Sequence, residues 1–206
     1  MTSTRISYLL RAHAWLALAA LALVAGCVSQ ETKRDAINDI NAAFKAEYEA
    51  SLAKNGARVV SANPGEAFDA VYAAFVKLGL VVRTQSRALG FINADAPAPL
   101  PLNRGEWDQA AAVDLPKAKE LLRRHVGALA ELFHFEPEGI DTVMTATIIG
   151  VRDGSEISFT MRMREVVPPK SGLPRRDYPP PTALKMGLDK LWGTVDRELA
   201  ARLRKP

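Results

Sequence analysis

Cysteine is almost absent from this chain, because Cys27 is the only one in 206 residues. A single thiol cannot close a disulfide within the chain, and it cannot build a zinc–thiolate cluster. Histidine is also scarce, with only three residues, His13, His125 and His134. Thiol nucleophiles, disulfide scaffolds and histidine-rich metal centres therefore drop out of the functions open to this sequence.

Catalytic motifs are missing as well. The chain has no Gly-x-Ser-x-Gly elbow, no phosphate-binding loop, no His-Glu-x-x-His and no Gly-x-Gly-x-x-Gly after an expected strand. His134, Glu136 and Glu138 offer nitrogen and oxygen ligands, but the Pro-Glu-Gly sequence at 137–139 favours a solvated turn. His125 follows two arginines on an expected helix and indicates a surface position. We expect no enzymatic activity, no cofactor and no metal.

A short apolar run near the N-terminus ends at the cysteine. Arg5 and Arg11 precede the apolar segment Trp15–Val24, which is shorter than the roughly 20 residues that span a bilayer. The sequence Val24-Ala25-Gly26-Cys27 follows directly. This layout resembles the lipobox signal peptide of bacterial lipoproteins. The resemblance implies that residues 1–26 are removed, that the Cys27 thiol receives a diacylglyceryl group and that its amine is acylated.

The residue after the cysteine bears on location. It is Val28, where aspartate favours inner-membrane retention in Gram-negative lipoproteins, so the resemblance implies a lipid anchor at the periplasmic face of the outer membrane. A transmembrane anchor, or a secretory peptide with a chance cysteine, is the alternative. Removal of residues 1–26 would also take two arginines from a chain of net charge +4. This weak charge and an exported location argue against nucleic acid as a partner.

Beyond the signal segment, a tether over 27–56 precedes one expected domain over 57–206. The tether contains an amphipathic helix, Glu31–Lys54, which ends at Asn55-Gly56. Its apolar residues recur every three or four positions: Ile37, Ile40, Phe44, Tyr48 and Leu52. We expect this stripe to pack on the chain's own domain, with a partner or a coiled coil as the alternative.

A helix followed by a hairpin is expected first in the domain. After a short strand, Ala57–Ala62, the residues Asn63, Pro64 and Glu66 form a helix-starting capping box. The expected buried stripe is Phe68, Val71, Tyr72 and Phe75. Two strands, Leu80–Thr84 and Leu89–Ala94, follow, and the prolines of Ala96–Pro101 predict a loop or an edge excursion.

The same order is expected a second time. Asp114-Leu115-Pro116 predicts a helix start, and its apolar positions are Ala118, Leu121, Leu122, Val126, Leu129, Leu132 and Phe133. Strands Ile140–Val151 and Ser155–Val166 flank Asp153-Gly154, a type I′ hairpin signal. The expected register pairs Ile148 with Phe159, Ala146 with Met161 and Met144 with Met163. One face is then apolar, and the other carries threonines and arginines.

A proline-rich, basic loop over 167–181 leads to a last helix from Thr182. Its stripe is Leu184, Leu188, Leu191, Val195, Leu199 and Leu203, with Trp192 beside it. The expected fold is α+β, with an antiparallel sheet of about four to five strands and helices on one face. The segments Leu78-Gly79-Leu80-Val81-Val82 and Leu89-Gly90-Phe91-Ile92-Asn93-Ala94-Asp95 resemble the helix-grip-like domains of lipoproteins that accompany outer-membrane assembly machines.

The candidate site is a group of arginines. Arg162 and Arg164 should project from the helix-free face of the sheet, near the chain that continues to Arg175 and Arg176. Guanidinium groups can bind carboxylates or phosphates through forked hydrogen bonds, although arginines also simply keep a sheet face soluble. We expect a non-enzymatic accessory lipoprotein that binds an envelope protein. The alternatives are a carrier of a small apolar or anionic ligand between the last helix and the sheet and, with less support, an envelope hydrolase.

Overall fold

The computed structural model describes residues 29–167 and 180–203. Cys27, Arg175, Arg176, the signal segment and most of the proline-rich loop lie outside these residues. The described part is α+β, as expected, with four α-helices, one 3₁₀ helix and a five-stranded antiparallel sheet. The elements are α2 (Gln30–Asn55), β1 (Ala57–Val60), α3 (Pro64–Lys77), β2 (Val81–Ser86), β3 (Phe91–Pro97), α4 (Arg104–Val126), η1 (Gly127–Leu132), β4 (Ile140–Val151), β5 (Gly154–Glu165) and α5 (Pro181–Leu203).

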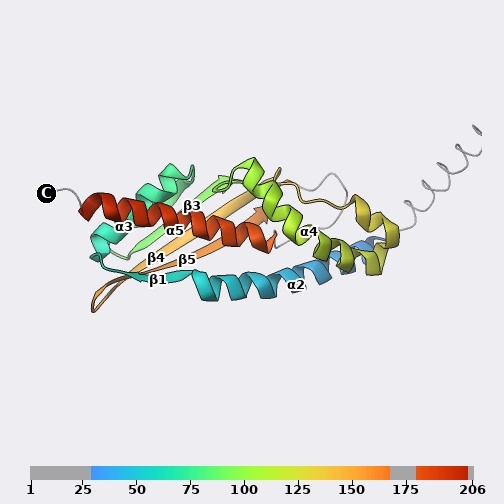
Figure 1. The fold of residues 1–206 in the computed structure, drawn as a ribbon, viewed down its shortest axis with the longest axis horizontal. Coiled ribbons are helices and arrows are strands. Elements are labelled where there is room, and N and C mark those ends of the chain that lie inside the picture. The colour runs from blue at the N-terminus through green and yellow to red at the C-terminus, as the bar shows by residue number, and fades with distance from the viewer. Residues whose placement is uncertain (1–28, 168–179, 204–206) are drawn as a thin grey trace, which may run out of the picture.

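Helices cover one face of the sheet. The strand order is β1-β5-β4-β3-β2, and α3 and α5 lie across the same face (Figure 1). Alternate residues of β3, β4 and β5 are buried under these helices, as the period of two in a strand requires. Phe159 packs against Trp192 of α5 and Phe75 of α3, with ring centroids 4.6 and 6.1 Å away. The core therefore lies between the sheet and two helices.

The register of the long hairpin differs from the expected one by two residues. Ile148 pairs with Ile157, Ala146 with Phe159 and Met144 with Met161. A shift of two preserves the faces, so the expected apolar face is still the buried one. The loop consists of Arg152 and Asp153, and neither residue has a positive φ. The turn is therefore not type I′, which needs positive φ at both central positions.

Glycine is needed at position 154 because of the neighbouring strand β1 and not because of the turn. It is the first residue of β5, with a φ of 143°, and a Cβ there would lie 2.0 Å from the Val60 carbonyl oxygen. The glycine thus allows the end of β1 to approach the hairpin closely. β1 is also shorter than expected, because it ends at Val60 and not at Ala62.

Helix α3 begins as expected. The Asn63 side chain accepts a hydrogen bond from the Glu66 N–H at 2.9 Å, and the Glu66 carboxylate accepts one from the Asn63 N–H at 3.2 Å. The expectation that Tyr72 is buried was wrong, because its exposed fraction is 38%. The other three residues of the predicted stripe, Phe68, Val71 and Phe75, are buried as expected, and alanines at 67, 70 and 74 are buried with them.

The predicted start of the next helix was wrong. Helix α4 begins at Arg104, after an Asn103 side chain that accepts a hydrogen bond from the Glu106 N–H at 2.9 Å. Pro116 lies inside this helix. The proline removes one bond to the Ala112 carbonyl, but both residues are on the exposed side, where water can hydrate that carbonyl.

Helix α4 also ends earlier than the expected stripe. It stops at Val126, and η1 continues the chain to Leu132, whose exposed fraction is 75% instead of the expected burial. Strand β3 is longer than expected, because it reaches Pro97 and pairs that residue with Asp141. Pro97 can close this ladder since it is the last residue of the strand, and the Ala98 N–H bonds to the Ile140 carbonyl.

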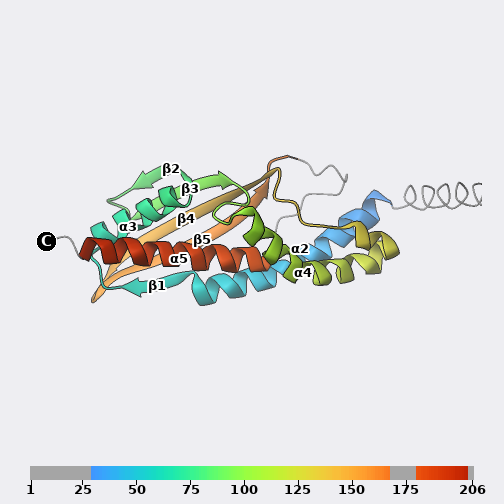
Figure 2. The same cartoon turned by 45° about the horizontal axis from the view of Figure 1, so that its top comes forward.

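Helices α2 and α4 form an arm that continues beyond the end of the sheet (Figure 2). The predicted stripe of α2 is buried at Ile37, Ile40, Phe44 and Tyr48, and it packs on α4 and α5. This confirms that α2 packs on its own domain. The Tyr48 hydroxyl donates to the Met161 carbonyl, and Trp192 Nε1 donates to the Asn55 carbonyl at 2.7 Å. The arm is therefore tied to both the sheet and α5.

Candidate functional site

The second face of the sheet has no covering helix in residues 29–167 and 180–203. Its outward side chains on β3, β4 and β5 are partly or fully exposed, and we call this surface the open face. Its residues are Phe91, Asn93, Asp95, Asp141, Val143, Thr145, Thr147, Ile149, Glu156, Ser158, Thr160, Arg162 and Arg164.

The two described arginines of the expected site lie on this face. Arg162 and Arg164 alternate with the buried Met161 and Met163 on β5, and both are exposed. An Arg164 Nη2 atom lies 3.6 Å from Asp141 Oδ2, across the strand pair. Arg162 lies opposite Val143 and has no ion-pair partner within the described residues. The structure thus brings two guanidiniums to one end of the open face.

Two acids that were not predicted from the sequence accompany these arginines. Asp141 faces Arg164, and Asp95 accepts a hydrogen bond from Arg83 Nε at 2.5 Å. Arg83 stands at the irregularity of β2, between Val82 and Thr84. The signal was available for Asp141, which alternates with buried residues of the predicted strand Ile140–Val151, whereas Asp95 lies one residue beyond the predicted strand Leu89–Ala94. This end of the open face is therefore mixed in charge, and Arg162 is the arginine there without an ion-pair partner among residues 29–167 and 180–203.

The middle of the open face carries hydroxyl and amide groups. Thr145 pairs with Thr160 on one side and with Asn93 on the other, and Asn93 Nδ2 donates to Thr145 Oγ1 at 3.0 Å. At the hairpin end, Glu156 pairs with Val59 and with Ile149, which are 62% and 56% exposed. The open face thus changes from apolar, through hydroxyl-rich, to arginine-bearing along the strands.

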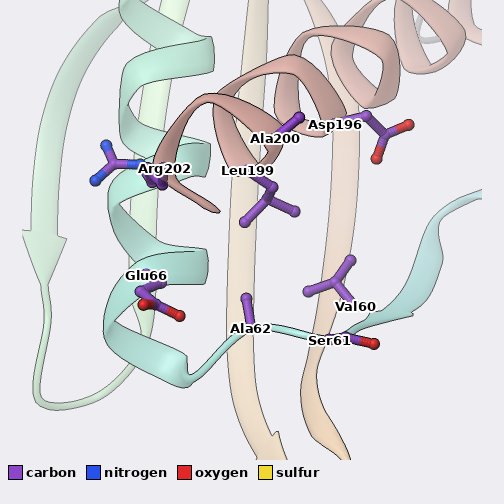
Figure 3. A pocket seen from close by; sticks show the side chains of 8 residues that line it. All are labelled: Val60, Ser61, Ala62, Glu66, Asp196, Leu199, Ala200 and Arg202. Carbon is purple, nitrogen blue, oxygen red and sulfur yellow. The ribbon is translucent and has the colours of Figure 1, made fainter. Parts of the chain in front are cut away.

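A groove lies at the opposite side of the sheet, near the end of α5. It has a volume of about 310 Å³, and Leu199 extends toward Ala62 within it (Figure 3). Its charged lining residues have partners nearby: Arg202 Nη1 lies 3.6 Å from Asp69, and Asp196 lies 3.8 Å from Arg58. The Nε of Arg202 is buried without an acceptor. The groove therefore offers an apolar floor, and the guanidinium of Arg202 extends from its edge toward Asp69 of α3.

The space beneath the middle of α5 is filled by side chains. Leu184, Leu188, Leu191 and Trp192 are buried there against Phe159 and other sheet residues. Within the described residues, the groove at the helix end is where a ligand between α5 and the sheet would find room.

The two histidines of the described residues each lie beside an acid. His134 Nε2 lies 2.7 Å from Glu136, and His125 Nε2 lies 2.8 Å from Asp39. No cluster of three histidine, cysteine, aspartate or glutamate side chains suited to a metal occurs in the described ranges. Asp114, which was expected at a helix start, is instead buried inside α4, and burial raises the pKa of its carboxyl.

Comparison with known proteins returned no similar protein: the chain matches no protein family, no curated protein and no solved structure. Within residues 29–167 and 180–203, no helix combines the length and the apolar character needed to cross a membrane.

Proposed function

We propose that this protein is a lipid-anchored, non-enzymatic accessory protein of the cell envelope. Cys27 carries the lipid at the periplasmic face of the outer membrane, and the open face binds a protein partner with acidic side chains. The sequence Val24-Ala25-Gly26-Cys27 supports the anchor, and Val28 supports the outer membrane.

One observation carries the binding proposal: Arg162 is exposed on a sheet face without a covering helix and has no acid beside it in the described residues. An exposed guanidinium retains its five donors for an incoming carboxylate. The adjacent threonines can exchange hydrogen bonds with a partner, and Ile149 adds an apolar contact. These groups together supply the charged, hydroxyl and apolar contacts that protein interfaces combine.

Site-specific photo-crosslinking in cells tests this proposal. A photoreactive residue at Thr160 should give a defined protein adduct, whereas one at the exposed Gln109 of α4 should not. In the Arg162→Glu/Arg164→Glu background the Thr160 adduct should disappear, because the carboxylates of the partner are then repelled. Extending the reversal to Arg175 and Arg176 should have the same effect.

The matched control reverses two exposed lysines elsewhere, as Lys54→Glu/Lys185→Glu, and should leave the adduct intact. Circular dichroism of each variant establishes that the fold is retained. Undiminished crosslinking in the arginine variant, or equal crosslinking from Gln109, would rule out the open face as the partner site.

The groove favours a second candidate, binding of a small ligand with an apolar part and an anionic group. Arg202 at its edge supplies a positive charge, and Leu199 supplies the floor. Native mass spectrometry of the purified protein should then show a retained small molecule that Leu199→Trp, which fills the groove, displaces. A wild-type mass without any adduct would contradict this candidate.

A further inference from the structure

The outer end of the arm brings the start of α2 beside the end of α4. His125 contacts Asp39 at 2.8 Å, and Lys117 contacts Glu47, so contacts further along α4 reach positions nearer the start of α2. The two helices are therefore antiparallel. Their shared end includes Ser29, η1 and the residues just after η1, and it points away from the sheet (Figures 1 and 2).

Apolar residues dominate the surface of η1. Its sequence is Gly-Ala-Leu-Ala-Glu-Leu, with Leu132 75% exposed and Ala128 also exposed. The single acid of η1, Glu131, forms ion pairs with Arg123 at 2.5 Å and with Lys119 at 3.2 Å, so its negative charge is balanced. The hydrogen bond from Arg123 lowers the pKa of this carboxyl. An exposed leucine beside an acid whose charge is balanced by two cations suits an interface between water and lipid.

The last turn of α4 adds a cation. Arg124 is exposed and has no ion-pair partner within the described residues. A long arginine side chain beside an apolar turn can bind a lipid phosphate while its methylenes stay near the acyl boundary.

The proximity of Cys27 to this end identifies the occupant. Ser29 caps α2 through its hydroxyl, which accepts a hydrogen bond from the Thr32 N–H at 3.0 Å, and only two residue steps separate Ser29 from Cys27. Two steps of chain reach at most about 7 Å. An acylated Cys27 would therefore hold the arm end within a headgroup's thickness of the bilayer.

We propose that the arm end, with Leu132 of η1 and Arg124 of α4, docks on the phospholipid surface that carries the anchor. This inference rests on the lipid anchor proposed above. It assigns α2 a second role, because α2 first reaches the sheet at Tyr48, whose hydroxyl donates to the Met161 carbonyl. The 18 residue steps from Gln30 to Tyr48 rise about 27 Å, and this rise sets the distance of that contact from the membrane when the arm stands upright. The open face is then presented to partners at a set height.

Fluorescence depth measurement on the lipidated protein in vesicles tests the docking. Because acylation consumes the only thiol, a cysteine introduced as Leu132→Cys is the single site for a polarity-sensitive label. Its emission should shift to the blue and be quenched by lipids with a nitroxide at the headgroup. The control is Leu89→Cys, which is equally exposed at 78% but lies in the β2–β3 turn at the other end of the molecule.

A second labelled site excludes insertion driven by the dye. A label at Ala128→Cys should be quenched in the otherwise unchanged protein and should lose this quenching when Leu132→Asp is added, with circular dichroism unchanged. If the protein floats with vesicles but the labels at 132 and 89 are quenched equally, the docking is overturned while the anchor stands. Failure to float overturns the anchor and the docking together.

Discussion

Asp114 shows how one side chain can hold two helices together. Its carboxylate accepts hydrogen bonds from the Thr182 N–H and the Thr182 hydroxyl, both at 2.8 Å. A residue in the middle of α4 thus caps the start of α5, since the first N–H groups of a helix have no partner of their own. The pKa of Asp114 is raised by burial, although the Thr182 bonds act in the opposite direction.

Two substitutions of Asp114 should distinguish the stabilisation that comes from its hydrogen bonds to Thr182 from the effect of its negative charge. Asp114→Ala should lower the free energy of unfolding by about 1–2 kcal/mol, because the α5 N–H loses its acceptor. Asp114→Asn should cost less, since the amide oxygen can still accept and its NH₂ can donate to the Thr182 hydroxyl. Denaturant unfolding of the three proteins at one pH measures these differences.

The stability of the wild-type protein relative to Asp114→Asn should also depend on pH. Because the pKa of Asp114 is raised in the folded protein, the folded state binds a proton more readily than the unfolded state. Wild type should therefore lose stability relative to Asp114→Asn as the pH rises from the ordinary aspartate pKa through the raised one. If the difference in stability between wild type and Asp114→Asn stayed constant with pH, the pKa of Asp114 would not be raised in the folded protein.

Among the elements, the β4–β5 hairpin makes the most specific stability prediction. Phe159 is 3% exposed between Phe75 and Trp192, whereas Thr160 lies on the open face. Phe159→Ala should cost about 3–5 kcal/mol because it leaves a cavity. Thr160→Ala should change stability by less than about 0.5 kcal/mol. Similar denaturation midpoints for the two variants would show that the faces are exchanged.

Local signals explain which elements the sequence predicted. Asn63 as the N-cap, Pro64 at the first helical position and Glu66 in the capping box each predict a helix start, and α3 begins there. Asn103 and Glu106 make the same capping box, but Pro116 drew the predicted start to Asp114. The proline signal was misleading because its consequence depends on which side of the helix meets water. That exposure is a tertiary property.

The candidate site was predictable only in part for a similar reason. The alternation on β5 placed Arg162 and Arg164 outward, and the structure confirms their exposure. The register error of two residues hid the contact between Arg164 and Asp141. A turn sequence restricts register, but the close approach of β1 at Gly154 also determines it, and short sequence patterns do not reveal such distant contacts.

At the scale of the whole molecule, the proposed lipid anchor depends on a single side chain, that of Cys27. Cys27→Ser should give a chain that keeps residues 1–26 or becomes soluble in the periplasm, because no lipid can be added. Fractionation with salt and carbonate washes, together with the mass of the N-terminal peptide, measures this. A serine variant that remains membrane-bound after both washes and lacks residues 1–26 would contradict the anchor.

The two outer strands of the sheet determine how a partner can approach. β1 is only four residues long, and β2 is interrupted at Arg83, which turns to Asp95. Short and irregular edges cannot guide a further strand through a continuous backbone ladder. Addition of a peptide as a sixth strand is therefore disfavoured at both edges, and so is fibril-like stacking of copies. Recognition of the proposed partner would consequently depend on side chains, so substitutions should alter it without disturbing the backbone.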